Sequence, residues 1–537
     1  MNTSNKQYHL ILIVLILFVS IFDLKSQTSN QTDYIIIVQP IVVCADDGTG
    51  PASIVLPEDL IDRAYEKANI DFYFLEPIYY NNTKARDGLI NLDEICELAE
   101  KDGLLKGSGG IVNMFFVNSV DGHKGPLGRG MFGGNITFIA LGDEPQAEME
   151  AFVIGHEVAH NLSLPHVVDD PKINDTIPNL LGEGDFSQRI DPKYSLTAYQ
   201  IETIMKSRLV HKRVDMLSVE KGKLAILDET FEPYFKNLQL KEIAAFTQTD
   251  VFDKSIIEAR VFAKEYFSNS VMAFNDKEES ALLWLVNEVN TILIDNGLSF
   301  MAHHPWRFIK VNDSLCGGFA HTRGVYIILS EKHLSRLTNK WSENMTEETR
   351  SDLIVRMGSL IVHEQLHSIQ RTFPSKFEEL FHKQWGFQKA IVSNDELLIM
   401  NQLSNPDAPI ANWLVPNTNA DTLFYWVRTL LKESEGIPRM GADFIDKVFE
   451  VELKNGKYYL KTSSDGHPIC SSLDDFTKYK NRFPVKRGLD HPNEISAYMF
   501  SDYFISMFNK SVPFDNAEKE AKSNSEDFIR WIKNYLN

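Results

Sequence analysis

Along residues 34–162, the apolar positions change between a strand period and a helix period, which predicts a mixed α/β fold. The β-branched run at residues 34–43 predicts a buried strand, and the apolar spacing at residues 57–69 predicts a helix. Further strand-like runs follow at residues 70–80, 110–117 and 135–141. From Pro145, a residue suited to the first turn of a helix, the pattern is helical as far as residue 162.

The second half of the chain has mainly helical patterning. A helix is predicted there at residues 493–507, whereas the helix predicted at residues 197–210 lies near the end of the first domain. Between the two halves, residues 215–254 mix charged and apolar positions without strong strand signals, as expected of a helical connection. The C-terminus is also helical and amphipathic.

Two strand signals interrupt this helical pattern. Residues 324–330 are strand-like and precede a helix whose capping signal is Asn344-x-x-Glu347. Asn455-Gly456 is the strongest hairpin signal in the chain, because both residues accept the backbone conformation of a tight turn. The strand-like runs on either side of it are residues 448–453 and 457–461.

The length of 537 residues is too great for one typical hydrophobic core, so we expect at least two domains. Lys6 precedes an apolar run at residues 10–22, which is short for a membrane span and fits the core of a signal peptide. An uncleaved anchor is the alternative. The expected segments are a signal peptide (1–27), a first domain (28–215), a helical connection (216–254) and a second domain (255–537).

Composition and charge narrow the class of protein. With 43% hydrophobic and 24% charged residues, the chain is globular, and its net charge of -20 leaves no broad basic surface for nucleic acid or an anionic membrane. After signal cleavage no segment looks membrane-spanning. The cysteines allow one disulfide per half, Cys44 with Cys96 and Cys316 with Cys470, or else are unpaired buried thiols. Oligomeric state is not predicted.

The strongest candidate chemistry is a His-Glu-x-x-His motif at residues 156–160, which is followed by His166. Residues four apart share one face of a helix, so His156 and His160 can bind one ion while Glu157 points toward the water that the ion polarises. Three imidazoles leave zinc an open fourth position for a water whose pKa falls toward about 7. A structural alternative is a helix whose histidines merely pair with its own acids.

This extended motif, with the strand order before it, resembles the metzincin clan of zinc endopeptidases over residues 34–210. The resemblance implies that His156, His160 and His166 bind zinc. It also implies that Glu157 is the general base in peptide-bond hydrolysis. A further implication is an edge strand that pairs with an extended substrate backbone. The residues expected in that strand are Asn135, Ile136, Thr137, Phe138 and Ile139.

Two positions depart from the metzincin pattern. Ser163 stands where the clan has glycine, and a left-handed conformation there would cost on the order of 1 kcal/mol, which a site closed by metal tolerates. Leu181, in the stretch at residues 178–184, stands where the clan has a methionine beneath the zinc. Because leucine supplies a similar apolar volume, we expect a floor without the sulfur.

A second His-Glu-x-x-His motif comprises His363, Glu364 and His367, without a histidine at the metzincin spacing. Glu494 opens a predicted helix downstream and resembles the third zinc ligand of the gluzincin clan. The resemblance implies a His2Glu zinc site in a mainly helical α+β domain, with Glu364 as the base. Alternative third ligands closer to the motif are Glu378, Glu379 and His382.

Several other side chains are weaker candidates. By the same analogy, His491 or Tyr498 could stabilise the oxyanion of the second site. Asp46-Asp47 and Asp169-Asp170 could bind calcium, although solvated acidic loops are the more common explanation.

Together these patterns predict an exported zinc metalloendopeptidase that acts on protein or peptide substrates and carries one zinc ion per domain. Two alternatives stay open. In one, only the N-terminal domain is catalytic, and the C-terminal domain is a degenerate binding or scaffold module. In the other, both domains form a non-catalytic zinc-containing binding protein. The cleaved bond is not predicted, because specificity depends on pocket shape.

Overall fold

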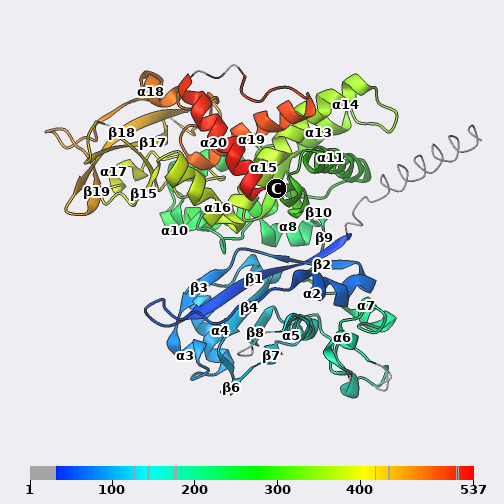
Figure 1. The fold of residues 1–537 in the computed structure, drawn as a ribbon. Helices are drawn as coiled ribbons and strands as arrows, with labels where there is room; N and C mark the ends of the chain where they lie inside the picture. Colours follow the sequence, from blue (N-terminus) through cyan, green and yellow to red (C-terminus); the bar gives the residue numbers. More distant parts are fainter. Residues whose placement is uncertain are drawn as a thin grey trace, which may run out of the picture.

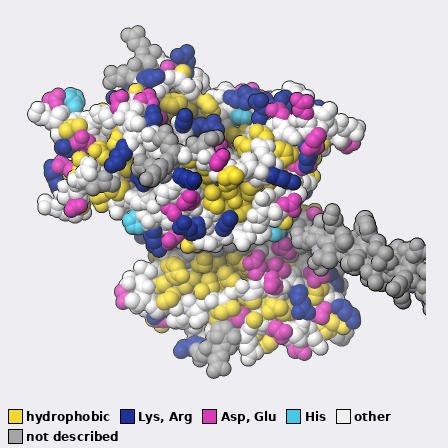
Figure 2. All heavy atoms as spheres, turned by 45° about the horizontal axis from the view of Figure 1, so that its top comes forward, with side chains coloured by type: hydrophobic (Ala, Val, Ile, Leu, Met, Phe, Trp, Pro, Cys, Tyr) yellow, Lys and Arg dark blue, Asp and Glu magenta, His cyan; other side chains and the backbone are white. Residues whose placement is uncertain are grey.

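The chain folds into two lobes, a smaller one built by residues up to Lys212 and a larger one built by the rest (Figure 1). The computed structural model describes residues 32–125, 127–141, 146–173, 178–182, 184–417, 419–432, 436–515, 517 and 519–537. The expected signal peptide and Pro145 lie outside these ranges. Among the helices described, none is long and apolar enough to cross a membrane. Acidic and basic side chains are interspersed over the face shown in Figure 2.

A seven-stranded sheet is the centre of the smaller lobe, in the order β2-β1-β4-β8-β7, with β3 and β9 also paired to β1. Its strands are β1 (Tyr34–Cys44), β2 (Ile70–Phe74), β3 (Ile78–Asn81), β4 (Val112–Val117), β7 (Leu127–Gly130), β8 (Ile136–Ala140) and β9 (Val210–Lys212). Strands β5 (Ser119–Val120) and β6 (His123–Lys124) form a separate short ribbon. Apolar side chains of β1 and β4 alternate between two hydrophobic clusters, one on each face. The mixed α/β class is therefore confirmed.

Helices cover both faces of this sheet. One cluster contains α2 and α5, and the opposite cluster contains α3 and α4. The helices of this lobe are α2 (Glu58–Tyr65), α3 (Thr83–Arg86), α4 (Leu92–Lys101), α5 (Ala147–Asn161), α6 (Phe186–Arg189) and α7 (Ala198–Ile204). The Tyr65 hydroxyl donates to the Gly155 carbonyl at 2.7 Å, which fixes α2 against the helix that carries the first motif.

Strand β8, expected to be a substrate-binding edge strand at residues 135–139, lies inside the sheet. It pairs with β4 on one side and with β7 on the other, and all its residues are buried. The edge is β7, which is antiparallel to β8 and partly exposed. Glycine is rare in strands, so Gly128 and Gly130 give β7 no strand signal in the sequence. The structure needs glycine at position 130, because a Cβ there would lie only 2.0 Å from the Glu157 carbonyl oxygen. The edge-strand prediction was therefore wrong.

Helix α5 ends in the strained turn that the sequence predicted. Ser163 has a φ of 69°, in the left-handed region. Its N–H donates to the His160 carbonyl at 2.9 Å, and the Leu164 N–H donates to the Ala159 carbonyl at 3.0 Å. This pair of bonds is a Schellman motif, in which the left-handed residue is usually glycine. The turn reverses the chain and returns His166 toward the helix.

The larger lobe contains a second sheet, in the order β10-β12-β14-β13, with β11 also paired to β12. Its strands are β10 (Val214–Met216), β11 (Val271–Met272), β12 (Trp306–Val311), β13 (His321–Arg323) and β14 (Tyr326–Ser330). Strand β13 is antiparallel to β14 and forms the edge, as β7 does in the smaller lobe. The second motif lies beside it on α15 (Ser359–Thr372).

The helix that precedes α15 begins later than predicted. Helix α14 (Glu347–Leu353) is capped by the side chain of Thr346, and Asn344 is not its cap. A π-helical turn at Ile354–Gly358 then joins α14 to α15. The other helices of this lobe are α8 (Val219–Ala225), α9 (Leu240–Thr247), α10 (Ile256–Asn269), α11 (Asp276–Asp295), α12 (Ser299–His303), α13 (Glu331–Thr338), α16 (Pro374–Glu378), α17 (Glu396–Ile399), α18 (Thr477–Lys480), α19 (Pro492–Phe508) and α20 (Lys519–Tyr535).

A six-stranded antiparallel sheet is inserted between the second motif and α19, in the order β15-β16-β17-β18-β19 with β20 paired to β18. Its strands are β15 (Gln388–Lys389), β16 (Trp413–Pro416), β17 (Leu423–Leu431), β18 (Phe444–Lys454), β19 (Lys457–Leu460) and β20 (Cys470–Ser472). Asn455 and Gly456 have φ values of 51° and 74°, so the predicted tight hairpin turn is confirmed. The rest of this sheet was missed, because runs such as β17 are apolar without alternation.

The segment expected as a helical connection belongs to the larger lobe. Helices α8 and α9 pack into one hydrophobic cluster with β12 and β14. The chain leaves the first sheet at β9, which pairs with β1, and enters the second at β10, which pairs with β12. Arg213, the residue between them, is buried and forms an ion pair of 2.7 Å with Asp71.

A second contact joins the motif helix of the larger lobe to the smaller lobe. His304, the C-cap of α12, is buried. Its Nδ1 lies 2.7 Å from the Tyr73 hydroxyl of β2, and its Nε2 lies 2.8 Å from the Ser368 hydroxyl of α15. The side chain therefore links α15 directly to the first sheet.

The four cysteines are free thiols. Cys44 and Cys316 are buried, Cys96 is half-buried and Cys470 is exposed. The disulfides Cys44–Cys96 and Cys316–Cys470 are therefore not formed, and the alternative of unpaired thiols holds. Burial raises the pKa of the Cys96 thiol to about 11, which keeps it protonated and unreactive at neutral pH.

Replacing Ser163 by glycine is expected to stabilise the protein by about 0.5–1 kcal/mol, because glycine adopts the left-handed conformation without a Cβ clash. The change would be measured as a higher thermal unfolding midpoint at constant metal concentration. Ser163→Ala is the matched control, since alanine keeps the Cβ and gains nothing. Equal midpoints for the two variants would contradict the strain at this position.

Candidate metal centres

The first motif brings three imidazoles together. His156 and His160 lie one turn apart on α5, and the Schellman turn places His166 opposite them. One nitrogen of each ring lies within 4.8 Å of the other two, and the Nε2 atoms of His156 and His166 are 3.2 Å apart. These nitrogens could hold a metal ion. His156 is buried and His166 is exposed, so the centre opens to solvent on the His166 side.

Backbone carbonyls orient two of these rings. His156 Nδ1 lies 2.8 Å from the Leu180 oxygen, and His160 Nδ1 lies 2.8 Å from the Leu164 oxygen. Each Nδ1 therefore donates its proton, which leaves the Nε2 lone pair for a metal ion. Burial lowers the pKa of His156 to about 3, and burial also lowers the pKa of His160. Both rings are thus neutral, as metal ligands must be.

The turn that contains Leu181 supports His156. Leu181, expected as an apolar floor, is buried in the hydrophobic cluster around α5. Sequence reasoning missed Arg189, whose guanidinium lies 3.8 Å from the centre of the Phe152 ring and donates to the Leu180 oxygen at 3.2 Å. The carbonyl that holds His156 is therefore itself held by Arg189. No motif signals this role, because Arg189 lies in the short helix α6.

Glu157 lies beside the three imidazoles and contacts the edge strand. The Gly130 N–H of β7 donates to Glu157 Oε2 at 2.7 Å. Burial raises the pKa of the Glu157 carboxyl to about 7, although the bond from Gly130 opposes that rise. A carboxyl with such a pKa can both accept and release a proton near neutral pH.

The second motif builds a fully buried set of ligands. His363 and His367 lie one turn apart on α15, with their Nε2 atoms 3.2 Å from each other. Glu494, in the first turn of α19, has carboxylate oxygens 3.5 Å from His363 Nε2 and 3.4 Å from His367 Nε2. The structure thus places the distant glutamate at the two histidines. This His2Glu set could hold a second metal ion.

Side chains behind this second set fix its orientation. The Asn405 amide donates to Glu494 Oε1 at 2.8 Å. Gln370 Oε1 lies 2.8 Å from His367 Nδ1, and the Gln370 amide donates to the Asn493 carbonyl at 3.0 Å. The bond to Gln370 leaves His367 Nε2 free to face the site, in the same way as the carbonyl bonds of the first centre.

The pKa shifts of the second set indicate that its glutamate is stabilised by nearby positive charge. Burial disfavours the charged form of Glu494, but His367 and His363 outweigh this effect and lower its pKa to about 2. Burial also disfavours a charged His363, yet Glu494 raises the pKa of that imidazole. A metal cation between these groups would supply such a charge.

The alternative third ligands lie elsewhere. Glu378 and Glu379 form ion pairs with Lys389 and Lys383, and neither joins the second set of ligands. His382 Nδ1 lies 2.8 Å from the carbonyl of Phe387, in the segment that leads to β15. None of the three is needed to complete the set with Glu494.

The two candidates for oxyanion stabilisation differ. His491 is the N-cap of α19: its Nδ1 accepts from the Asn493 N–H at 3.1 Å, and its Nε2 lies 3.2 Å from the Ile410 carbonyl. Both ring nitrogens are thus used by the backbone, and the role of His491 stays a prediction. Tyr498 lines the cavity at the centre, with its ring 4.4 Å from that of His363, and its role stays a prediction.

Glu364 also contacts an edge strand. The Thr322 hydroxyl of β13 lies 2.9 Å from Glu364 Oε2 and 2.9 Å from the Glu364 carbonyl oxygen. Burial raises the pKa of the Glu364 carboxyl to about 7. The relation of Glu364 to β13 is therefore the same as that of Glu157 to β7.

Both acidic pairs considered for calcium contain side chains that accept hydrogen bonds from backbone N–H groups. Asp46 accepts from the Thr83 N–H at 2.8 Å, and Asp47 accepts from the Thr49 N–H at 2.9 Å. Asp170 accepts from the Lys172 N–H at 3.0 Å. Within the described ranges, groups of three potential metal ligands occur only in the two histidine sets. A calcium site is not formed by these residues.

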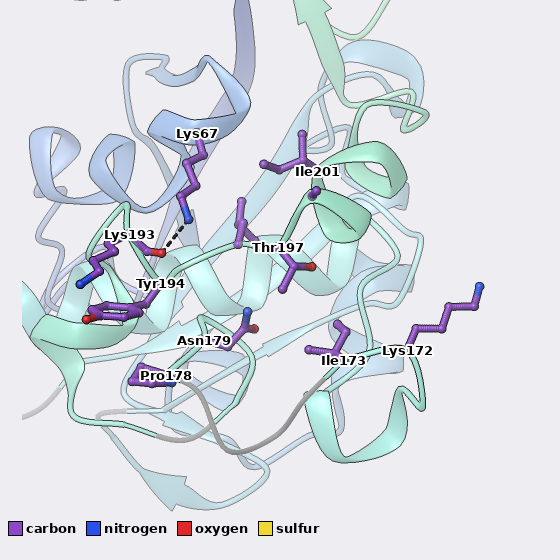
Figure 3. Close-up of a pocket in the computed structure, with 11 residues that line it drawn as sticks. Lys67, Lys172, Ile173, Pro178, Asn179, Lys193, Tyr194, Thr197 and Ile201 are labelled. Carbon is purple, nitrogen blue, oxygen red and sulfur yellow. Dashed lines mark hydrogen bonds between the residues drawn. The ribbon is translucent and has the colours of Figure 1, made fainter.

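A cavity of about 490 Å³ adjoins the loop of the first centre (Figure 3). Its walls include Asn179, next to Leu180, and the Lys193 carbonyl, which accepts from Lys67 Nζ at 2.7 Å. Its lining contains none of the three imidazoles and no carboxylate. It therefore adds no catalytic group to the first centre.

No protein-family model matches this chain, and no curated protein matches its sequence. The geometry of the two centres is therefore the basis for assigning a function.

Metal counting should give two ions per chain, because two separate ligand sets are formed. After loading with Zn²⁺ and dialysis, mass spectrometry of bound metal is expected to show two ions in the wild type and one each in His156→Ala and His363→Ala. His123→Ala, in an exposed ribbon, is the control and should keep both. Two ions retained by His363→Ala would exclude the second set as a metal site.

Replacing Gly130 by alanine should push β7 away from α5, since the new Cβ would lie 2.0 Å from the Glu157 carbonyl oxygen. We expect a loss of about 1–3 kcal/mol of stability, seen as a lower thermal unfolding midpoint. Gly155→Ala on the same helix is the control, because its Cβ would meet no atom closer than 3.7 Å. If both variants unfold at the wild-type temperature, β7 is not held tightly against α5.

Proposed function

We propose that this protein is a zinc-dependent metallopeptidase whose first centre hydrolyses peptide bonds. The observation that carries the proposal is the juxtaposition of His156, His160 and His166 with the buried carboxyl of Glu157. Three imidazoles without a fourth protein ligand are typical of catalytic zinc, whereas structural zinc sites have four.

The spacing of the ligand atoms supports zinc. Zinc binds imidazole nitrogens at about 2.0–2.1 Å, so two nitrogens of a tetrahedral site lie about 3.3 Å apart. The Nε2 atoms of His156 and His166 are 3.2 Å apart, and those of His363 and His367 are also 3.2 Å apart. When bound, zinc would supply a water of lowered pKa and polarise the carbonyl of the substrate.

The residues of the first centre would then have separate roles in hydrolysis. Glu157 accepts a proton from the attacking water and passes it to the nitrogen of the leaving group. The Gly130 N–H holds the Glu157 carboxylate on the side of the edge strand. Strand β7 is the last strand of the sheet, so its outer side suits an extended peptide as an additional strand, although its Gly130 N–H is already used by Glu157.

The likeness of the lobes to metzincins and gluzincins is part of this proposal. In each lobe two parallel strands and an antiparallel edge strand precede the motif helix, with the β5–β6 ribbon added in the smaller lobe and α13 and α14 added before α15 in the larger. In each, the edge strand contacts the motif glutamate. The ligand sets, three histidines in the smaller lobe and His2Glu in the larger, support the respective likeness.

The second centre would use the same chemistry, with Glu364 as the base. Its ligands are complete, and Glu364 is positioned by Thr322. Export from the cell is also part of the proposal, and it rests on the apolar run at residues 10–22 of the sequence.

Replacing Glu157 by glutamine should lower kcat at the first centre by about 100-fold or more while zinc remains bound, because the amide cannot accept the proton. Turnover would be measured on a peptide library by mass spectrometry, with zinc counted in the same sample. Glu148→Gln, an exposed change in the first turn of α5, is the control and should have wild-type activity. Unchanged turnover in Glu157→Gln would exclude this residue as the base.

The variant Glu364→Gln tests whether the second centre causes the turnover that remains in Glu157→Gln. We expect the products that persist in Glu157→Gln to disappear when Glu364→Gln is added. If Glu364→Gln alone behaves as wild type and Glu157→Gln is inert, only the first centre is catalytic. A zinc-loaded wild type that cleaves nothing in the library would leave the protein as a binding protein.

A further inference from the structure

The second centre lies in a cavity of about 1320 Å³ in the larger lobe. His363, Glu364 and Glu494 contribute to its wall, together with the loop that contains Asn405 and Asp407. This loop lies in sequence between α17 and β16, far from either motif. It gives the second centre groups that the first centre does not have.

The edge strands of the two centres differ in their accessibility. Strand β7 is partly exposed, whereas all three residues of β13 are buried. The N–H of Thr322, the middle residue of β13, donates to Asp407 Oδ1 at 2.5 Å. A peptide that joined this edge as a new strand would need that N–H for one of its carbonyls. Asp407 therefore occupies a position where substrate backbone would pair.

The loop of Asp407 is anchored and forms part of the wall. Arg371 of α15 donates to the Pro406 carbonyl at 2.9 Å, and Asn405 donates to Glu494 at 2.8 Å. The Ser404 N–H donates to Glu242 Oε1 at 2.6 Å. Displacing this loop would break the bond that orients the ligand Glu494. A continuous peptide strand along β13 is thus disfavoured, and the site fits the end of a chain better.

The groups beside the base are hydrogen-bond acceptors. Asp407 is 8% exposed and lines the cavity. His321, 2% exposed and also in the lining, has its Nδ1 3.1 Å from the Phe319 carbonyl, so its proton resides on Nδ1. Among the described residues no hydrogen-bond partner reaches His321 Nε2, which leaves an unused lone pair. A carboxylate and a bare imidazole nitrogen are complementary to an ammonium group.

The position of Asp407 relative to the base matches a terminal amino group, while His321 is a second acceptor in the lining of the same cavity. In an amino-terminal residue, the nitrogen lies two covalent bonds, or about 2.5 Å, from the carbonyl carbon that is attacked. The ammonium site must therefore adjoin the general base. Thr322 provides this proximity, because its N–H contacts Asp407 while its hydroxyl contacts Glu364.

We propose that the second centre acts on peptides with a free amino terminus, whose ammonium group is held by Asp407 and His321. This inference rests on the proposed function, since it names the substrate class of the same centre. It assigns the two lobes complementary substrates: extended peptide along β7 in the smaller lobe, and chain ends at β13 in the larger lobe.

The electrostatics around Asp407 agree with a cationic ligand, although lysines and arginines line other parts of the cavity. Burial, with Glu364 and Glu494 nearby, raises the pKa of Asp407 well above its usual value. Arg371, which anchors the loop of Asp407, is already paired with Glu232 and bonded to the Pro406 carbonyl. An ammonium group would add positive charge where buried carboxylates are crowded.

The test uses the full chain with Glu157→Gln, so that turnover reports the second centre. A hexapeptide with a free amino terminus and its N-acetylated form are compared by kcat/KM, with products identified by mass spectrometry. We expect release of the first residue from the free peptide and about 100-fold lower kcat/KM for the acetylated one. Asp407→Asn should remove most of this preference, because asparagine can still accept from Thr322 but has no charge.

The control variant is Asp446→Asn, which makes the same chemical change in the lining of the same cavity. Its bond from the Thr429 hydroxyl, 2.7 Å in length, can be kept by the asparagine oxygen. It should retain the preference for the free peptide. Both asparagine variants should bind zinc as the parent does.

A binding measurement gives a readout that does not depend on turnover. In the His156→Ala background, calorimetry with leucine hydroxamate and N-acetyl-leucine hydroxamate should show at least about tenfold tighter binding of the free amine. Asp407→Asn should abolish that difference. Equal affinities of the two compounds would overturn the proposal.

The outcomes separate this inference from the proposed function. Cleavage of both peptides at equal rates, lost in Glu364→Gln, overturns the amino-terminal preference but leaves a catalytic second centre. If neither peptide is cleaved, the second centre is not catalytic and cannot be a peptidase that acts on chain ends. In that case a preference for the free hydroxamate would identify the pocket only as a binding site for amines.

Discussion

Both centres depend on the contact between a motif helix and an antiparallel edge strand. In the smaller lobe, the Gly130 N–H meets the Glu157 carboxylate at 2.7 Å, and in the larger lobe the Thr322 hydroxyl meets that of Glu364 at 2.9 Å. The contact sets the distance between strand and helix, and it positions the acid beside the imidazoles. It also requires glycine in β7, where the backbone of α5 leaves no room for a Cβ.

The two lobes use this shared arrangement differently. The edge of β7 is open, and its centre has an exposed third ligand, His166. The edge of β13 is closed by Asp407, and all three ligands of its centre are buried. The inserted antiparallel sheet explains this difference, because the segment between its strands β15 and β16 carries both Asn405 and Asp407. The insertion thus changes the approach to a centre without changing its ligands.

Local sequence patterns predicted many of the helices, strands and candidate ligands. They could not predict contacts between residues far apart in the sequence. The histidines of each motif were predictable because helical spacing alone brings them to one face, and Glu494 because it opens a helix. Strand β7 was not, since Gly128 and Gly130 carry no strand signal and are needed only because α5 passes close by. Asp407 was also not predictable, because it contacts β13 only after its loop has folded against that strand.

The buried His304 affects the free energy needed to separate the two lobes. Its ring nitrogens contact Tyr73 in the smaller lobe and Ser368 in the larger, and Ser368 directly follows the ligand His367. Separating the lobes would break the hydrogen bond between His304 and Tyr73, at a net cost of about 0.5–1.5 kcal/mol. The lobes are therefore energetically coupled, so that a change in their relative position would disturb the hydrogen bond at Ser368, next to His367.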